Sequence, residues 1–199
     1  MSGPRTTPAL PGLSRIVLTG FMGAGKTTVG ALLADHLGWQ FVDSDRIVED
    51  RAGLTIAGIF TRHGETAFRE MEAAAIRDAA SGDRLVLALG GGALELLPTR
   101  EFLASLPACR IVFLEAPLDT LLARCAAHNA GPVRPVLQDR ARLAERWQAR
   151  LPLYRQAHLT ISTAGLAPAA VAEQILTALS DPGGESPLCS SAQASGARA

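Results

Sequence analysis

The chain has 199 residues, of which 48% are hydrophobic. That length and composition suit one domain with a single buried core and argue against a second domain. Acidic and basic residues balance at 19 each, so the overall charge favours neither nucleic acid nor a membrane surface as a partner.

Residues 15–19 form a β-branched apolar run that ends at Gly20, and residues 26–37 carry apolar side chains at helical spacing until Gly38. This order predicts a strand, a loop and a helix. Further strands are expected at residues 39–42, 84–89, 110–114 and 159–161. Further helices are expected at residues 45–51, 66–79, 117–126, 140–150 and 168–179.

Apolar strands that alternate with amphipathic helices are typical of a parallel sheet covered on both faces. The pattern predicts an α/β domain over residues 15–180, a three-layer sandwich with a central parallel five-stranded sheet. Residues 127–139 contain too much glycine and proline for a continuous helix, so we expect a mobile loop there.

Both ends of the chain are rich in small residues and proline. We expect residues 1–14 to be a disordered extension and residues 181–199 a disordered tail. The first residues lack the apolar centre of a signal peptide, and no apolar run approaches the roughly 20 residues that span a bilayer, which indicates a cytosolic protein. The spacing of Cys109, Cys125 and Cys189 indicates neither a metal site nor a disulfide.

The loop after the first strand has the spacing G-x-x-x-x-G-K-T over residues 20–27. A strand before it and a helix after it are the context that a Walker A phosphate loop requires. Backbone N–H groups of such a loop point at phosphate oxygens, and the helix adds its positive N-terminal end. The motif predicts a fold of the P-loop NTPase type and bound ATP. A chance glycine-rich turn is the alternative.

Lys26 is the only lysine of the chain. We expect its ammonium to reach the β- and γ-phosphates and the Thr27 hydroxyl to ligate Mg²⁺. A planar guanidinium does not replace a compact ammonium that follows a migrating phosphoryl group, although an accident of composition would also leave one lysine. The nucleotide-binding residues expected in this loop are Gly23, Ala24, Gly25, Lys26, Thr27 and Thr28.

Five further short motifs follow the phosphate loop in order. They lie at residues 41–45 (FVDSD), 68–72 (FREME), 90–92 (GGG), 134–137 (RPVL) and 150–154 (RLPLY). The ordered set resembles the shikimate kinase family over about residues 15–179.

The resemblance implies an enzyme that transfers the γ-phosphoryl group of ATP to the 3-hydroxyl of shikimate. The products would be ADP and shikimate 3-phosphate, in the pathway to chorismate and the aromatic amino acids. ATP and Mg²⁺ are the implied cofactors. We expect a cytoplasmic monomer without nucleic-acid or membrane partners.

By this resemblance, Asp43 holds Mg²⁺, while Asp45 binds hydroxyl groups of shikimate and orients or deprotonates the attacking one. A carboxylate at the carboxyl end of a strand beside the phosphate loop can do either. The alternative is that both residues only cap the next helix. The implied catalytic residues are Lys26, Asp45 and Arg134.

The resemblance also implies that Arg69 and Arg150 bind the substrate carboxylate, since a guanidinium fork matches a carboxylate with two hydrogen bonds. Glu72, three residues after Arg69 on the expected helix, can hold that fork in place. Solvated arginines and a plain turn after the third strand are the alternatives. The other implied substrate contacts are Gly90, Gly91 and Gly92, where glycine lets the backbone approach the ring.

Arg134 matches the lid arginine of the family, and residues 127–139 are the expected lid. A guanidinium that arrives on closure neutralises charge on the transferred group, and closure excludes water. Arg124 matches an arginine that stacks on adenine, with a surface position as its alternative. Gly58 and Val136 depart from the family pattern, and the lid is slightly longer than in compact relatives.

Two other functions compete with this prediction. A gluconate-type sugar-acid kinase would share the phosphate loop and also bind a carboxylate, but the glycine triplet and the pair Phe68 and Arg69 argue against it. A nucleotide-binding regulatory module without catalysis would not be expected to keep the complete set of charged residues. We therefore predict a shikimate kinase.

Overall fold

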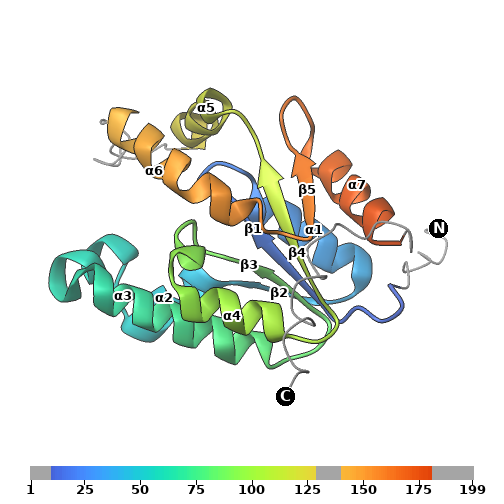
Figure 1. The fold of residues 1–199 in the computed structure, drawn as a ribbon, viewed down its shortest axis with the longest axis horizontal. Helices are drawn as coiled ribbons and strands as arrows, with labels where there is room; N and C mark the ends of the chain where they lie inside the picture. The colour runs from blue at the N-terminus through green and yellow to red at the C-terminus, as the bar shows by residue number, and fades with distance from the viewer. Residues whose placement is uncertain (1–9, 129–139, 181–199) are drawn as a thin grey trace, which may run out of the picture.

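The computed structural model describes residues 10–128 and 140–180 (Figure 1). Five parallel strands form one sheet in the order β2-β3-β1-β4-β5. Their bounds are Arg15–Thr19 (β1), Gln40–Asp43 (β2), Leu85–Ala88 (β3), Cys109–Glu115 (β4) and Leu159–Ser162 (β5). The predicted α/β fold with a central parallel five-stranded sheet is confirmed.

Helices connect the strands and cover both faces of the sheet. Their bounds are Lys26–Leu37 (α1), Ser44–Ala52 (α2), Ile56–Ala80 (α3), Leu97–Ser105 (α4), Leu118–His128 (α5), Arg140–Tyr154 (α6) and Pro168–Ser180 (α7), with a 3₁₀ turn at Ala93–Glu95 (η1). α1 and α7 contact each other on one face, and Figure 1 shows α4 and α6 on the other.

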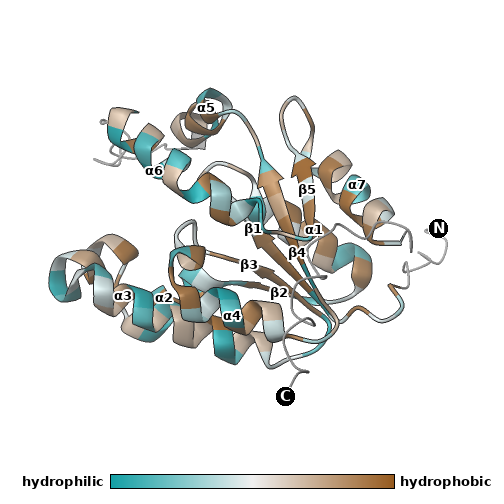
Figure 2. Ribbon diagram, in the orientation of Figure 1, coloured by the Kyte–Doolittle hydropathy of each residue, from teal (hydrophilic) through white to brown (hydrophobic). Residues whose placement is uncertain are grey.

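The core lies between the sheet and these two helical layers. Every residue of β1 and β3 is buried, and Figure 2 shows the apolar strands between helices of mixed hydropathy. The Phe113 ring of β4 stacks on Tyr154 at the end of α6, with ring centroids 5.2 Å apart. Burial of one such aromatic side chain contributes about 2 kcal/mol or more, so this contact holds the end of α6 to the sheet.

The parallel strands bring their carboxyl ends to one edge of the sheet. The register pairs Leu18 of β1 with Ala88 of β3, and Ala88 with Asp43 of β2. The segments that follow these three strands therefore begin side by side. Ligands of open α/β sheets bind at this edge, near the point where the strand order reverses.

Three helices differ from the sequence-based expectation. The helix expected from residue 66 already begins at Ile56, with a kink at Gly64, whose φ of 81° lies outside the helical region. α4 has no expected counterpart; its first turn contains Pro98, which suits the start of a helix. α6 runs past residue 150 and through Pro152 to Tyr154.

Residues 10–14, part of the expected N-terminal extension, lie against the domain. Leu10 is only 7% exposed, and Ser14 N donates to Ala108 O at 2.8 Å. Most of the expected lid, with Arg134, and the tail from residue 181 lie outside the described residues. None of the helices in the described ranges is long and apolar enough to cross a membrane.

Candidate active site

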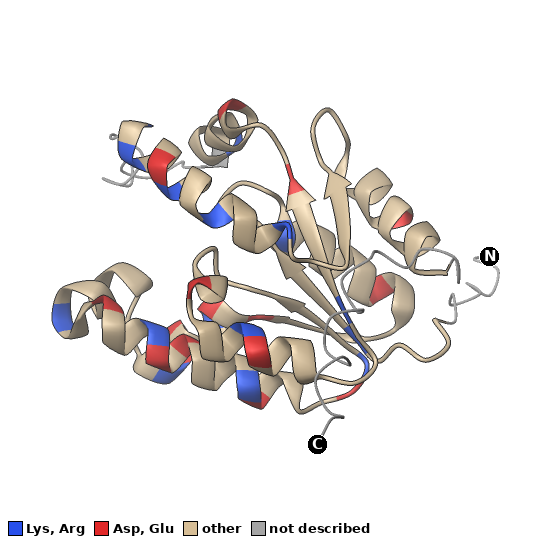
Figure 3. Cartoon of the chain, in the orientation of Figure 1, with Lys and Arg blue, Asp and Glu red and all other residues tan. Residues whose placement is uncertain are grey.

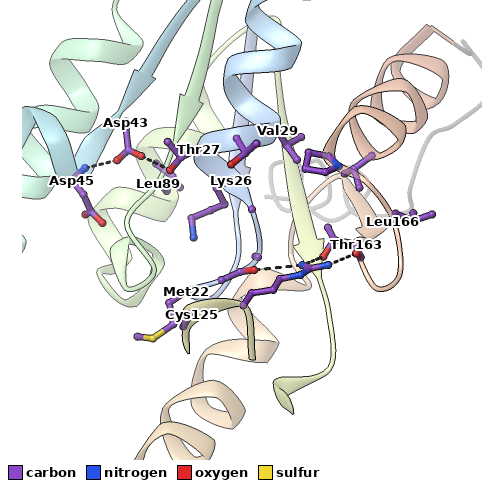
Figure 4. Close-up of a pocket in the computed structure, with 17 residues that line it drawn as sticks. Met22, Lys26, Thr27, Val29, Asp43, Asp45, Leu89, Cys125, Thr163 and Leu166 are labelled. Atoms are coloured by element: carbon purple, nitrogen blue, oxygen red, sulfur yellow. Dashed lines mark hydrogen bonds between the residues drawn. The ribbon is translucent and has the colours of Figure 1, made fainter. Parts of the chain in front are cut away.

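The segment between β1 and α1 turns tightly, as the phosphate-loop motif requires. Gly23 has a φ of 76°, and a Cβ on it would lie 2.4 Å from Leu121 O, so only glycine fits there. No side chain caps the start of α1 after Gly25, which leaves its first N–H groups directed at the loop. Residues 23–28 line a cavity of about 640 Å³ (Figure 4).

Lys26 lies inside this loop. Its Nζ donates to Gly20 O at 2.7 Å and to Phe21 O at 3.1 Å. Burial lowers the pKa of Lys26, whereas the nearby carboxylates of Asp45 and Asp43 oppose that shift. Both hydrogen-bond acceptors belong to the loop, so the ammonium stays at the position where the loop would hold phosphates.

Asp43, at the end of β2, uses both carboxylate oxygens. Oδ2 accepts a hydrogen bond from the Thr27 hydroxyl at 2.8 Å, and Oδ1 accepts one from Asp45 N at 3.1 Å (Figure 4). The second bond makes Asp43 the N-cap of α2. Asp43 therefore caps α2, but capping is not its only contact, because the same side chain also binds the phosphate loop.

Asp45 points into the cavity from the first turn of α2. Burial raises the pKa of Asp45, and the neighbouring Asp43 adds to the rise, while Lys26 and Arg69 oppose it. A carboxylate with a raised pKa accepts a proton more readily than an exposed aspartate does.

The glycine triplet after β3 lets two charged side chains reach the sheet edge. A Cβ on Gly90 would lie 2.4 Å from Asp45 Oδ1, and a Cβ on Gly92 would lie 2.2 Å from Arg69 Nη2. Either methyl group would displace the charged group it meets. Ser44 Oγ accepts from Gly90 N at 2.9 Å and ties the start of α2 to the same segment.

The middle glycine, Gly91, lies between the phosphate loop and α6. A Cβ on it would lie 3.7 Å from Arg150 Nη1 and 3.9 Å from Met22 N. Its carbonyl oxygen accepts a hydrogen bond from the Tyr154 hydroxyl. The triplet is thus the place where the phosphate loop, Asp45 and the two predicted arginines meet.

Arg69 of α3 is held by carboxylates. Its Nη1 donates to Glu72 Oε2 at 2.8 Å, which confirms the predicted pairing, and its Nη2 lies 3.2 Å from both Glu65 Oε1 and Glu95 Oε2. Arg150 Nη2 donates to the same Glu95 Oε2 at 2.9 Å. One oxygen of Glu95 therefore bridges two arginines from different helices.

Glu72 is 1% exposed. Its burial raises the pKa to about 7, although Arg69 acts in the opposite direction. Glu72 Oε1 has no hydrogen-bond partner among the described residues. It and Asp45 Oδ1 both lie close to the point where a Cβ on Gly90 would stand, so the two carboxyl groups are neighbours and ionisation of both is disfavoured.

Arg124 joins the phosphate loop to the segment after β5. Its guanidinium donates to Gly23 O at 3.4 Å, to Thr163 Oγ1 at 2.9 Å and to Thr163 O. Arg124 is half-buried and lines the cavity with Leu166 and Pro168. Arg124 thus lies at the surface of α5 with its guanidinium held by hydrogen bonds to the phosphate loop and to Thr163.

Glu65 and Glu95 lie at this edge without any sequence-based expectation, and Thr163 contributes its hydroxyl as well as its backbone. Thr163 directly follows β5, so its position after a parallel strand was the available signal. Glu95 follows the glycine triplet by three residues, but nothing in the spacing indicates that its side chain turns back. Cys109 and Cys125 form no disulfide, and no group of three or more His, Cys, Asp and Glu suited to a metal occurs among the described residues.

The phosphate loop at the carboxyl edge of this sheet defines a P-loop protein, a class that binds nucleotide phosphates. The comparison with known proteins narrows the class, because a family model described as shikimate kinase matches residues 22–180. The chain belongs to the shikimate kinase family. It is therefore an ATP-dependent phosphotransferase with an alcohol group as acceptor.

Individual relatives of the chain point to the same family. The shikimate kinase of Psychrobacter arcticus is 42% identical over 168 residues, which cover 84% of this chain and 89% of the relative. The shikimate kinase of Moorella thermoacetica is 42% identical over 172 residues, covering 85% and 95%. The solved structure of shikimate kinase from Acinetobacter baumannii in complex with shikimate is 41% identical, with a TM-score of 0.75 and coverage of 83% of this chain and 92% of that one.

Proposed function

We propose that the chain transfers the γ-phosphoryl group of ATP, with Mg²⁺, to the 3-hydroxyl of shikimate. The observation that carries the proposal is the meeting of Asp45, Arg69, Arg150 and the phosphate loop at the glycine triplet. A proton acceptor, two cations and a phosphate loop around one short segment suit a small hydroxy-acid as acceptor. The shikimate bound to the Acinetobacter baumannii enzyme supports the same substrate.

In the proposed reaction the 3-hydroxyl oxygen attacks the γ-phosphorus in line with the bond to the bridging β,γ-oxygen. That bond breaks and ADP leaves with its electron pair. The hydroxyl proton passes to the Asp45 carboxylate, whose raised pKa makes it a better acceptor. The Lys26 ammonium offsets the negative charge of the transferred group.

We assign the substrate carboxylate to Arg69 and Arg150. Their side chains are only 12% and 11% exposed, so water screens their charges weakly and an anion is attracted strongly. Arg150 Nε has no hydrogen-bond partner among the described residues. Both guanidinium groups already donate to Glu95, and a neutral sugar offers no charged acceptor in exchange for that carboxylate, which favours acids.

Thr27 and Asp43 are the proposed magnesium ligands. A hydroxyl and a carboxylate oxygen 2.8 Å apart beside the phosphate loop are the hard donors that Mg²⁺ prefers. Mg²⁺ in kinases takes most of its ligands from water and phosphates, so one carboxylate is sufficient. When bound, the ion supplies charge neutralisation at the phosphates.

For the nucleotide we propose contacts from residues 23–28 and from Arg124, whose fixed guanidinium offers a flat surface for a base. Arg134 is proposed as the lid arginine on the family resemblance alone. We also infer a cytoplasmic location, because the reaction requires cellular ATP, and we propose that the chain is a monomer. Sedimentation of the purified chain tests the oligomeric state, and a dimer would contradict it.

A coupled assay for ADP with purified chain, MgATP and shikimate tests the activity, and phosphorus NMR identifies the hydroxyl that is phosphorylated. Turnover of gluconate without turnover of shikimate would contradict the proposal. For the acid site, calorimetry compares Arg69→Ala with Arg77→Ala, an exposed arginine on the same helix. We expect Arg69→Ala to weaken shikimate binding by about 100-fold, since it removes a buried charged partner, and Arg77→Ala to leave binding unchanged.

A further inference from the structure

Glu95 lies where the carboxylate of the acceptor is proposed to bind. Its Oε2 accepts hydrogen bonds from Arg69 Nη2 at 3.2 Å and from Arg150 Nη2 at 2.9 Å. Charge-assisted bonds from two guanidinium groups are what these arginines would offer to a bound acid. The chain thus presents a carboxylate of its own to both arginines.

The backbone around Glu95 is fixed. Glu95 N donates to Gly92 O at 2.9 Å, and Arg100 Nη1 donates to Glu95 O at 3.1 Å. The η1 turn also contacts α4 and α6. The Glu95 side chain is nevertheless 38% exposed, whereas those of Arg69 and Arg150 are nearly buried. Its carboxylate can therefore rotate into water while both arginines stay in place.

The charges of the two arginines are already paired within the chain. Arg69 also contacts Glu65 and Glu72, so two guanidinium groups meet three carboxylates. In Figure 3, the charged residues of α6 are mainly basic, and acidic residues lie across the site from it. An incoming carboxylate would add a further anion beside those of Glu65 and Glu95, and like charges at close range repel.

The three carboxylates differ in their ability to leave. Glu72 is 1% exposed. If it left Arg69, it would lose its ion pair without reaching water. Glu65 is 61% exposed, and its described contact is with Arg69 alone. Glu95 is the one whose departure releases a hydrogen-bond donor on both arginines.

We propose that Glu95 is an internal competitor, which occupies Arg69 and Arg150 in place of the substrate carboxylate and is displaced when shikimate binds. This inference rests on the proposed acid-binding role of the two arginines. Every ligand that places a carboxylate on both arginines meets the same competition, and shikimate offsets it with the contacts of its ring hydroxyls. An acid without such further contacts would therefore bind only weakly.

The substitution Glu95→Gln in the full chain tests the competition. Glutamine has nearly the same shape but no charge, so it binds guanidinium groups less strongly. We expect calorimetry to show shikimate binding about three- to tenfold tighter, the factor by which occupancy of the arginines reduces the apparent affinity. The KM for shikimate should fall in parallel, while kcat and the KM for ATP stay within about twofold, because Glu95 is displaced in the ternary complex.

Glu65→Gln is the matched control, since Glu65 contacts Arg69 at the same 3.2 Å but does not bridge to Arg150. We expect it to change shikimate binding by less than about twofold, as is usual for an exposed ion pair. Shikimate methyl ester, which lacks the carboxylate, should gain nothing from Glu95→Gln.

Weaker shikimate binding to Glu95→Gln, an equal gain in Glu65→Gln, or an equal gain for the ester would each overturn the competition. The acid site itself has a separate test. If Arg69→Ala binds shikimate normally, the proposed role of the arginines is wrong. If Arg69→Ala loses binding and Glu95→Gln gains none, only the role of Glu95 is wrong.

Discussion

The side chains of Thr27 and Asp43 are hydrogen-bonded at 2.8 Å. This bond joins the first turn of α1 to the end of β2, and the other oxygen of Asp43 caps α2. A single carboxylate therefore aligns the phosphate loop, the second strand and the helix that carries Asp45. The same oxygens are the proposed ligands of Mg²⁺.

Asp43→Asn separates the two roles of this residue. Asparagine caps helices about as well as aspartate, so we expect the stability to change by less than about 1 kcal/mol. The lost charge should raise the Mg²⁺ concentration needed for half-maximal activity by about tenfold or more. Activity measured against Mg²⁺ at saturating ATP checks this; an unchanged Mg²⁺ dependence would remove Asp43 from the metal site.

Lys26→Arg keeps the positive charge but not its shape. The ammonium fits between Gly20 O and Phe21 O, a space that a wider planar guanidinium does not match. We expect kcat to fall by about 100-fold, comparable to the loss of one donor to the transition state. Circular dichroism should show an unchanged fold. Near-normal turnover would mean that the single lysine is an accident of composition.

Gly92→Ala should impair the acceptor site alone. The added methyl group would lie 2.2 Å from Arg69 Nη2, at the movable end of a side chain, so Arg69 shifts and the fold remains. We expect the KM for shikimate to rise by about tenfold or more, because displacement of a positioning group by an ångström is costly. The KM for ATP should not change.

Gly58→Ala is the control for Gly92→Ala. A Cβ on Gly58 would lie 3.4 Å from its nearest neighbour, the Thr55 hydroxyl, and alanine is favoured over glycine in a helix by about 0.5–1 kcal/mol. We expect normal kinetics and unchanged or slightly higher stability. Equal kinetic losses in both variants would show that the effect of Gly92→Ala is not local to Arg69.

Glu72 gives the stability a characteristic pH dependence. Its pKa is about 7 in the folded protein and 4.5 in the unfolded chain. The folded state therefore binds more protons between these values, and the free energy of unfolding falls as the pH rises from 4.5 to 7. The loss is on the order of 3 kcal/mol for a shift of this size.

Urea unfolding at several pH values, compared between the natural chain and Glu72→Gln, measures this contribution. As the pH rises towards 7, the natural chain should lose stability relative to Glu72→Gln. Above that pH, the difference in their free energies of unfolding should stay constant. A difference that is constant from pH 4.5 upwards would show that Glu72 titrates normally.

The sequence predicted the sheet well because its strands are short apolar runs that end in recognisable turns. It failed where a helix departs from the usual pattern. Gly58 and Gly64 interrupt the helical periodicity of the first part of α3, so that tertiary contacts with α2, rather than local propensity, stabilise the helix there. Pro152 indicates a helix end, yet α6 continues through it.

The candidate site was partly predictable for a related reason. Residues that follow parallel strands share one edge of the sheet, so the phosphate loop, Asp43 and the glycine triplet could be grouped in advance. The contacts of Glu95 could not, because they depend on how closely α3 and α6 each approach the η1 turn. Arg124 was ambiguous, since only the folded chain shows its partner Thr163 across the cavity.

The glycine triplet has a consequence for inhibitors. Gly91 lies against both the phosphate loop and Arg150. It follows the buried strand β3 by three residues, and its carbonyl oxygen is held by the Tyr154 hydroxyl. The span from the phosphates to the acid is therefore set by a segment that is anchored to the end of the sheet and to α6. A single molecule that joins a nucleotide to a cyclic acid should bind best with a stiff bridge of one length, and a flexible bridge should lose affinity through the entropy of its ordering.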